Sequence, residues 1–270
     1  MELNNENELP KSRCEILKWA RIHFNLTPAV NDIITKAANN IGTIEIKCSD
    51  KKLNTFYQSL VNNTKFNLAS FIHSIALSYF KFGEAIPYGK LVDKDGQYTW
   101  DKFILLEPEL VVVETDFLSP DKKFSLILPE ELIQQVKEGI ITASKVVEAV
   151  NAGTNLNLKE RDISLLARFT DPSATRGTSP IQSLFRELIY LEELRGKKMT
   201  TSVRDEMNST SNRIRTSLEL KTLGSLPQVR HAISQWLEHK FFKPIMKLNN
   251  MTTPPIITWK LPENKETNVS

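Results

Sequence analysis

The sequence predicts a helix-rich α+β fold with a small, mostly antiparallel sheet. Three observations support this. Apolar residues recur at helical spacing over both ends of the chain, whereas a central stretch changes to a period of two. Glycine is scarce, at 9 of 270 residues, which leaves few positions for the left-handed turns of a compact β-barrel. A hydrophobic share of 40% with 25% charged residues is typical of a chain that folds.

A length of 270 residues is near the upper limit for one hydrophobic core, so we expect two modest packing units or one elongated one. We divide the chain into a flexible tail at 1–12, an α/β unit at 13–178, a long-helix region at 179–261 and a second flexible tail at 262–270. The long-helix region contains a basic segment at 195–221.

The first third of the chain is predicted to be mainly helical. Apolar residues at helical spacing predict a helix that begins at Arg13, and Thr27-Pro28 is typical of the N-cap and first turn of a second helix that extends to 42. Residues 43–48 alternate as in a strand. Two further helices are expected at 52–61 and 67–82, and Gly83 ends the second of them.

The middle of the chain is predicted to form strands. Residues 84–92 and 98–106 read as a β-hairpin, because Asp95-Gly96 supplies the positive φ angles of its turn. Glu107-Pro108-Glu109 interrupts the pattern. Strands are then expected at 110–117 and 123–128, short helices at 129–138 and 143–152, and another strand at 162–169.

The C-terminal third is again predicted to be helical. Ser179-Pro180 with Gln182 is typical of a capping box before an apolar stripe at 181–194. Ser225 and Pro227 open a second such helix, which Pro244 is expected to kink or end. A last short strand is expected at 256–261.

The sequence lacks the common motifs of nucleotide binding and catalysis. It has no GxxxxGK[ST] or GxGxxG loop and no GxSxG elbow. Cys14 and Cys48 are too few for a disulfide scaffold, so we expect a reducing compartment. We expect Cys14 to be a buried structural residue rather than a nucleophile. The N-terminus is acidic and polar, unlike a signal peptide, and no apolar stretch is long enough to span a membrane. We therefore expect a soluble protein that is not an enzyme.

Histidines and carboxylates give no stronger evidence for a site. The four histidines are not at ligand spacing with Cys or acidic residues, so no metal and no cofactor are expected. An acidic row in extended chain is expected to face water rather than to serve acid–base chemistry: Glu107, Glu109, Glu114 and Asp116.

The most informative charge pattern is the segment between Arg195 and Lys221. It holds seven Lys or Arg against three acids, a surplus of four, while the whole chain has a formal charge of +3. The segment is also rich in Ser, Thr and Asn, which suits contact with phosphates without base readout. An exposed linker between two helices explains the same composition, and both interpretations stay open. We expect Arg186 to pair with a neighbouring Glu.

Beyond these patterns, part of the chain resembles a known family. Residues 162–194, with Asp171-Pro172 and Arg176-Gly177-Thr178-Ser179 before an amphipathic helix, resemble the portal proteins of tailed bacteriophages. Residues 80–85 before the hairpin resemble the entry of that family into its wing, and 105–112 resemble its Leu-Pro-Val strand. Residues 236–249 and 255–260 resemble a later long helix and a closing strand.

The resemblance implies a dodecameric homo-oligomeric ring at one capsid vertex of the virion, assembled in the host cytoplasm, with a central channel through which double-stranded DNA is packaged and ejected. It implies contacts with the major capsid protein, the terminase large subunit and head-completion or tail proteins, and none with a membrane. Such a channel avoids sequence-specific grip. We assign as candidates for the DNA channel Lys197, Lys198, Arg204, Arg213, Arg215 and Lys221.

Closed rings use heterologous interfaces, so some apolar residues of the C-terminal helices are expected to be buried between subunits. The candidates are Leu184, Phe185, Leu188, Trp236 and Phe241. One departure from the family is the short stretch 196–226, which has little room for stem and clip elements. The alternative is a nucleic-acid-binding adaptor or head-tail connector module that forms no ring.

Overall fold

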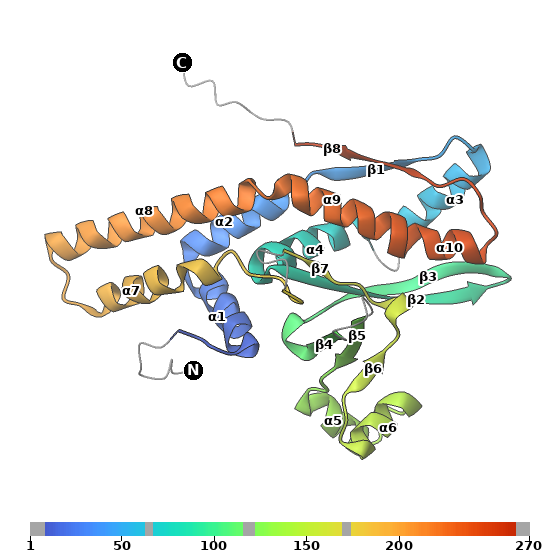
Figure 1. The fold of residues 1–270 in the computed structure, drawn as a ribbon, viewed down its shortest axis with the longest axis horizontal. Helices are drawn as coiled ribbons and strands as arrows, with labels where there is room; N and C mark the ends of the chain where they lie inside the picture. The colour runs from blue at the N-terminus through green and yellow to red at the C-terminus, as the bar shows by residue number, and fades with distance from the viewer. Residues whose placement is uncertain (1–8, 63–66, 116–121, 169–173, 263–270) are drawn as a thin grey trace.

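The computed structural model describes residues 9–62, 67–115, 122–168 and 174–262. It confirms the α+β prediction: helices dominate, and the strands form small antiparallel sheets. Figure 1 shows an elongated molecule in which α8, α9 and α10 follow one another along its length, with β1 and β8 above α9 and the other strands below.

The N-terminal helices follow the predicted pattern closely. Helix α1 (Arg13–Leu26) begins with a capping box in which Ser12 and Glu15 satisfy each other's backbone N–H groups. Helix α2 (Pro28–Asn39) has proline in its first turn, and Asp50 caps α3 (Lys51–Val61). Helix α4 (Leu68–Phe82) ends at Gly83, whose φ of 78° is left-handed.

The predicted β-hairpin is confirmed. Strands β2 (Glu84–Lys94) and β3 (Gln97–Leu106) pair antiparallel. Asp95 and Gly96 have φ angles of 56° and 83°, which the tight turn requires. The inner face of the hairpin packs on the helices through Trp100, which is 1% exposed and donates its Nε1–H to the Phe241 carbonyl at 3.0 Å.

A second sheet and a helical lobe follow the hairpin. Strand β4 (Val111–Thr115) pairs with β5 (Lys122–Leu126), as predicted, and β5 also pairs with β6 (Leu156–Leu158), which the sequence did not indicate. Helices α5 (Glu130–Lys137) and α6 (Ser144–Ala152) form the lobe at the bottom of Figure 1. The expected strand at 162–169 is only β7 (Leu166–Ala167), which joins β2; Phe169 lies outside the described residues.

Four helical segments form most of the C-terminal third. They are α7 (Phe185–Gly196), α8 (Thr201–Leu223), α9 (Leu226–Trp236) and α10 (Lys243–Leu248), and a π-helical segment (Leu237–Phe242) joins the last two. Pro244, which was expected to kink or end the helix, lies in the first turn of α10, directly after this π-helical segment. Proline is tolerated there because its missing N–H is not needed in a first turn. Strand β8 (Ile256–Lys260) returns to pair with β1 (Thr43–Lys47).

One local prediction in this region was wrong, and one of the two open interpretations of the basic segment does not hold. A 3-10 turn (Gln182–Leu184) precedes α7, so no capping box forms there. The Ser179 hydroxyl instead donates to the Lys81 carbonyl at 2.7 Å and accepts from the Ile181 N–H. The stretch expected to be an exposed linker is mostly the regular helix α8, whose first turn is capped by Thr200.

Most buried side chains belong to one large cluster. It includes residues of α1 to α4, the hairpin, and the helices from α7 to α10, so it contains residues from both sides of the expected boundary at 178/179. A small second cluster lies under β4 and β5, with Ile86, Val111, Phe124 and Ile163 buried in it.

Candidate nucleic-acid interface

The basic segment identified in the sequence lies in a helical hairpin formed by α7 and α8. Helix α8 packs against α2 and α7. A narrow stripe of buried residues attaches it, namely Thr210, Ile214, Leu218 and Thr222. Because this stripe covers only one side, the opposite side of this 23-residue helix is exposed, while residues that flank the stripe, such as Met207 and Leu223, pack partly against the core. The exposed residues of α8 are mostly hydroxyls, amides and cations, but they also include two acids and a leucine: Ser202, Arg204, Asp205, Glu206, Asn208, Ser209, Asn212, Arg213 and Leu220.

The candidate channel residues are distributed along the whole hairpin. Lys197 and Lys198 lie exposed at its tip, and Arg204 lies one turn into α8. Arg213 donates to the Thr210 hydroxyl at 3.2 Å, and Lys221 is bonded to the Ser183 hydroxyl. A carboxylate neutralises one of them, because Arg215 pairs with Asp32 of α2 at 3.1 Å.

The hairpin has less net positive charge than the linear segment indicated. Glu192 and Glu193 of α7 are exposed on the same hairpin, and Glu192 forms an ion pair with Arg195. Glu206 of α8 accepts a hydrogen bond from Tyr190 of α7. The surplus of four therefore overestimated the field at the tip, since the fold adds acids from outside the counted window.

A buried junction fixes the direction in which the hairpin leaves the body. The segment 176–179, which leads into α7, lies against the turn between α4 and β2. Gly83 and Gly177 meet backbone to backbone: a Cβ on Gly177 would lie 2.0 Å from the Gly83 oxygen, and one on Gly83 would lie 2.2 Å from the carbonyl carbon of Thr178. Neither position admits a larger residue without movement of the main chain.

One carboxylate holds this junction together. The Glu84 side chain is fully buried and accepts from Arg176 Nε at 3.0 Å and from the Gly177 N–H at 3.0 Å. Arg13 of α1 pairs with Glu84 at 2.9 Å and donates to the Gly177 carbonyl at 2.6 Å. Burial lowers the pKa of Arg13, and the neighbouring Glu84 opposes that shift.

Arg176 extends the junction to the second sheet. Its guanidinium donates to the carbonyl oxygens of Val111 and Pro108 at 2.7 and 3.0 Å. The junction therefore connects α1, the α4–β2 turn, the start of β4 and the segment before α7. The portal-like motifs at 80–85 and 176–179 thus contact each other in the fold.

The acidic row proves to be only partly solvent-facing. Arg21 of α1 pairs with Glu107 and with Glu109, at 2.5 and 3.1 Å, and the Glu109 side chain is only 17% exposed. The expectation that all four acids face water is therefore wrong for Glu109. Glu114 is exposed, and Asp116 lies outside the described residues.

The candidates for subunit contact are core residues of the single chain. The exposed fraction of each side chain is 5% or less in all five candidates, which are Leu184, Phe185, Leu188, Trp236 and Phe241. Phe185 packs on α1, and Trp236 and Phe241 pack on rings of α4 and β3. The chain's own core already buries all five side chains, so they leave no area for a neighbouring subunit. We reassign them to the core. The sequence showed that these positions are apolar, but it did not show which element covers them.

His23 and His73 make contacts typical of structural histidines, whereas Cys14 is not buried as expected. His23 is buried against Trp19 and Phe185, and this burial lowers its pKa to about 4. His73 is hydrogen-bonded to Asn39 at 2.8 Å. Cys14 is exposed rather than buried. Within the described residues, no three Cys, His, Asp or Glu side chains gather as metal ligands, and no helix is long and apolar enough to cross a membrane.

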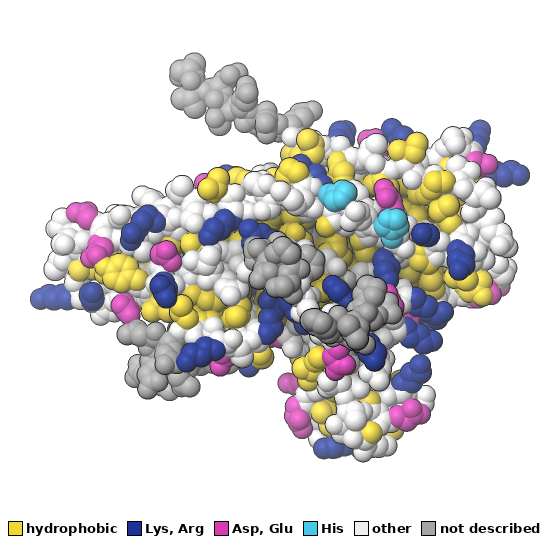
Figure 2. All heavy atoms as spheres, in the orientation of Figure 1, with side chains coloured by type: hydrophobic (Ala, Val, Ile, Leu, Met, Phe, Trp, Pro, Cys, Tyr) yellow, Lys and Arg dark blue, Asp and Glu magenta, His cyan; other side chains and the backbone are white. Residues whose placement is uncertain are grey.

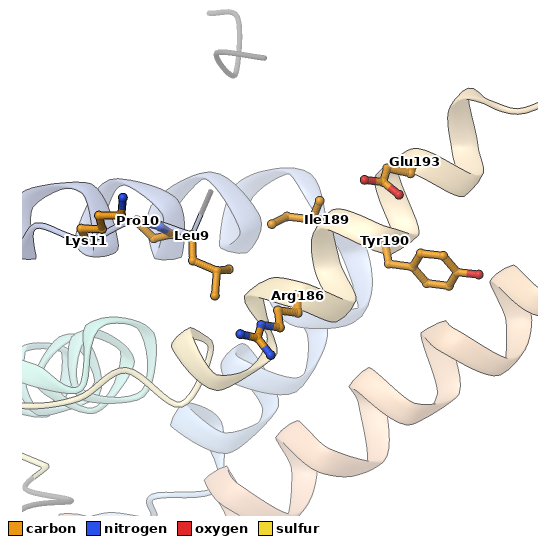
Figure 3. A pocket seen from close by; sticks show the side chains of 7 residues that line it. All are labelled: Leu9, Pro10, Lys11, Arg186, Ile189, Tyr190 and Glu193. Atoms are coloured by element: carbon orange, nitrogen blue, oxygen red, sulfur yellow. The ribbon is translucent and has the colours of Figure 1, made fainter. Parts of the chain in front are cut away.

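A hollow of about 530 Å³ lies between α7 and the residues that precede α1. Figure 3 shows Arg186, Ile189, Tyr190 and Glu193 extending from α7 at this hollow, with Leu9 beside it. The predicted ion pair of Arg186 with a neighbouring Glu does not form with any described residue. Arg186 therefore adds an exposed cation at the base of the hairpin.

A polar groove that was not predicted lies beside α8. A hollow of about 540 Å³ runs along α2, and every lining residue except Pro28 is polar: Asn25, Asn31, Asp32, Thr35, Lys36, Asn39 and Asn40. The Arg215–Asp32 pair connects this groove to α8. The signal was present in the sequence, because Asn31, Thr35 and Asn39 recur every four residues on the side of α2 opposite its buried stripe.

Comparison with known proteins adds no relative: no family model matches the chain, and no curated protein matches it. The case for a function therefore depends on the geometry described above and on the motif resemblance. The two observations that bear on it are the junction and the polar face of the hairpin.

Proposed function

We propose that this chain is the structural subunit of a portal-type ring of a tailed bacteriophage, which passes double-stranded DNA without acting on it chemically. In this proposal the α7–α8 hairpin and the groove on α2 form the surface that meets the duplex. The subunit supplies shape and a weakly charged track, while other proteins of the capsid vertex dock on the body.

The observation that carries the proposal is the junction around Glu84. The resemblance to portal proteins rests on short motifs that are far apart in the sequence. In the fold, two of them fit together through paired glycines and one buried carboxylate shared by two arginines. Motifs that matched a family by chance have no reason to build one structural unit, so this packing supports the resemblance.

The composition of the hairpin surface also supports the proposal. A duplex that must slide requires a surface that attracts phosphates without holding them, because each neutralised phosphate adds to affinity. The open side of α8 and the α2 groove present hydroxyl and amide groups with few unpaired cations. Such groups contact phosphate and sugar without base specificity.

The first test is the assembly state of the full chain. Light scattering after size-exclusion chromatography, together with negative-stain images, is expected to show a closed ring at micromolar concentration, with or without a DNA fragment present. A chain that stays monomeric under both conditions contradicts the ring and supports the adaptor alternative.

The second test concerns DNA. We expect weak binding of duplexes of any sequence, with a logarithmic salt slope near −0.9 for each phosphate contacted. Replacing Lys197, Lys198 and Arg204 by Ala is expected to reduce that slope by about two to three. Lys51 and Lys52 serve as a matched control, because they are also adjacent, exposed lysines near a helix start. An unchanged slope in the triple variant removes the hairpin tip from the DNA interface.

A further inference from the structure

The lobe of α5 and α6 is too small to be stable by itself. Its helices have 8 and 9 residues, shorter than helices that persist alone in water. Within them only Val136 and Ala149 are buried. Two isoleucines beside α5 are exposed: Ile127, before the helix, is 40% exposed, and Ile140, after it, is 67% exposed. These features are typical of an element that is completed by a partner.

The solvent side of α5 is acidic. Glu130, Glu131 and Glu138 are exposed, against one lysine of the same helix, Lys137. The three acids form no ion pair with any described residue, and Glu138 only accepts from Gln134. The helix therefore presents a surplus of negative charge, and an exposed isoleucine precedes it and another follows it in the chain.

The β2–β3 hairpin has the opposite character on its outer face. Lys90 and Lys102 are both exposed and lie directly opposite each other in the antiparallel register. Like charges at such a pair are destabilising, and neither lysine forms an ion pair with a described residue. Ile104, next on the same face, is 42% exposed. The arrangement is suited to an anionic partner that also brings an apolar side chain.

We propose that the acidic α5 surface of one subunit docks on the Lys90–Lys102 face of the next copy of this chain. The two surfaces match in charge and each carries exposed isoleucine. They lie on different parts of the molecule, with the lobe well apart from the hairpin in Figure 1, so the contact is heterologous. Heterologous contacts between identical chains close into rings when the rotation permits. This inference rests on the proposed function and assigns one of its interfaces.

Charge reversal tests the contact. Lys90→Glu with Lys102→Glu, and separately Glu130→Lys with Glu131→Lys, are each expected to raise the concentration needed for assembly at least about tenfold, measured by sedimentation velocity. Combining all four changes restores the attraction and is expected to recover assembly. The matched control is Lys51→Glu with Lys52→Glu, which reverses two exposed lysines on another part of the chain. We expect this variant to assemble at the same concentration as the wild type. Two milder variants of the same face are the double change Lys90→Gln with Lys102→Gln and the single change Ile104→Ser. Circular dichroism checks that each variant folds.

The outcomes separate this inference from the proposed function. If the wild type forms rings and neither reversal affects them, the interface is wrong and the ring stands. If the reversal of Lys90 and Lys102 weakens binding to a DNA duplex and leaves assembly intact, this face of the β2–β3 hairpin contacts DNA and the inference is overturned. A wild type that never assembles overturns the ring and this interface together. If the variant that carries all four charge reversals does not recover assembly, the proposed contact between the α5 surface and the Lys90–Lys102 face is also rejected.

Discussion

Neutralising Glu84 is the most direct test of the junction. Glu84→Gln keeps the size of the side chain but removes the charge that faces two guanidinium groups. The Glu84 side chain has no exposed area, while those of Arg176 and Arg13 are 16% and 31% exposed. Removing one partner of a buried ion pair costs roughly 3–5 kcal/mol. Because Arg13 is partly solvated, we expect a loss near the lower end, about 3 kcal/mol.

The assay is urea denaturation at pH 7 with the free energy of unfolding as readout. Glu107→Gln is the matched control, because it removes a similar pair with Arg21 at a site where the carboxylate is 51% exposed. We expect it to cost at most about 1 kcal/mol. A Glu84→Gln, Arg176→Met double variant is expected to recover part of the loss, since the buried guanidinium is then gone. Equal, small losses for Glu84→Gln and Glu107→Gln refute the junction as described.

Three further predictions concern stability. His23 is buried in its neutral form, and burial lowers its pKa from 6.5 to about 4. The contribution of this group to the free energy of unfolding is therefore fully present above pH 6.5 and is lost as the pH falls toward 4, by roughly 1.4 kcal/mol per pH unit. The free energy of unfolding of His23→Gln, measured against pH, is expected to vary less over this range. Gly177→Ala places a Cβ 2.0 Å from a backbone oxygen and is expected to cost at least about 2 kcal/mol in urea, whereas Gly196→Ala meets no atom within 4 Å and is neutral or stabilising. Trp100→Phe removes the buried donor to the Phe241 carbonyl. We expect it to lower the free energy of unfolding by about 1–3 kcal/mol in thermal or urea unfolding. An unchanged free energy of unfolding contradicts a stabilising role for this hydrogen bond.

Local patterns predicted most elements because their signals are local. The Asp95-Gly96 turn, the capping residues Ser12 and Asp50, and the left-handed Gly83 are each determined by neighbours within four residues. Short strands were harder to predict. Strand β7 has only two residues, and it exists because β2 lies beside it, a contact that no window of sequence reveals.

The pairing of distant segments was not predictable from patterns. Strand β8 was expected as an element, but its partner β1 lies more than two hundred residues away in the chain. The same holds for the junction. Glu84 looked like the first residue of a strand, and only the fold brings Arg13 and Arg176 to it. Sequence patterns identify which residues are apolar or charged, whereas tertiary contacts decide which of them remain available.

Helix α8 illustrates this limit and bears on the proposed function. Its sequence is polar enough to resemble a linker, because only Ile214 and Leu218 supply fully buried apolar side chains. Packing on α2 and α7 nevertheless holds the helix, and it brings Asp32 of α2 to Arg215. Glu192 already lies beside the basic tip, because it pairs with Arg195 within α7. The fold therefore converts a segment that looks strongly basic into a long, polar and nearly balanced face. For a surface that must let a duplex pass, this balance is favourable, because every unpaired cation removed from the track weakens non-specific affinity and its dependence on salt.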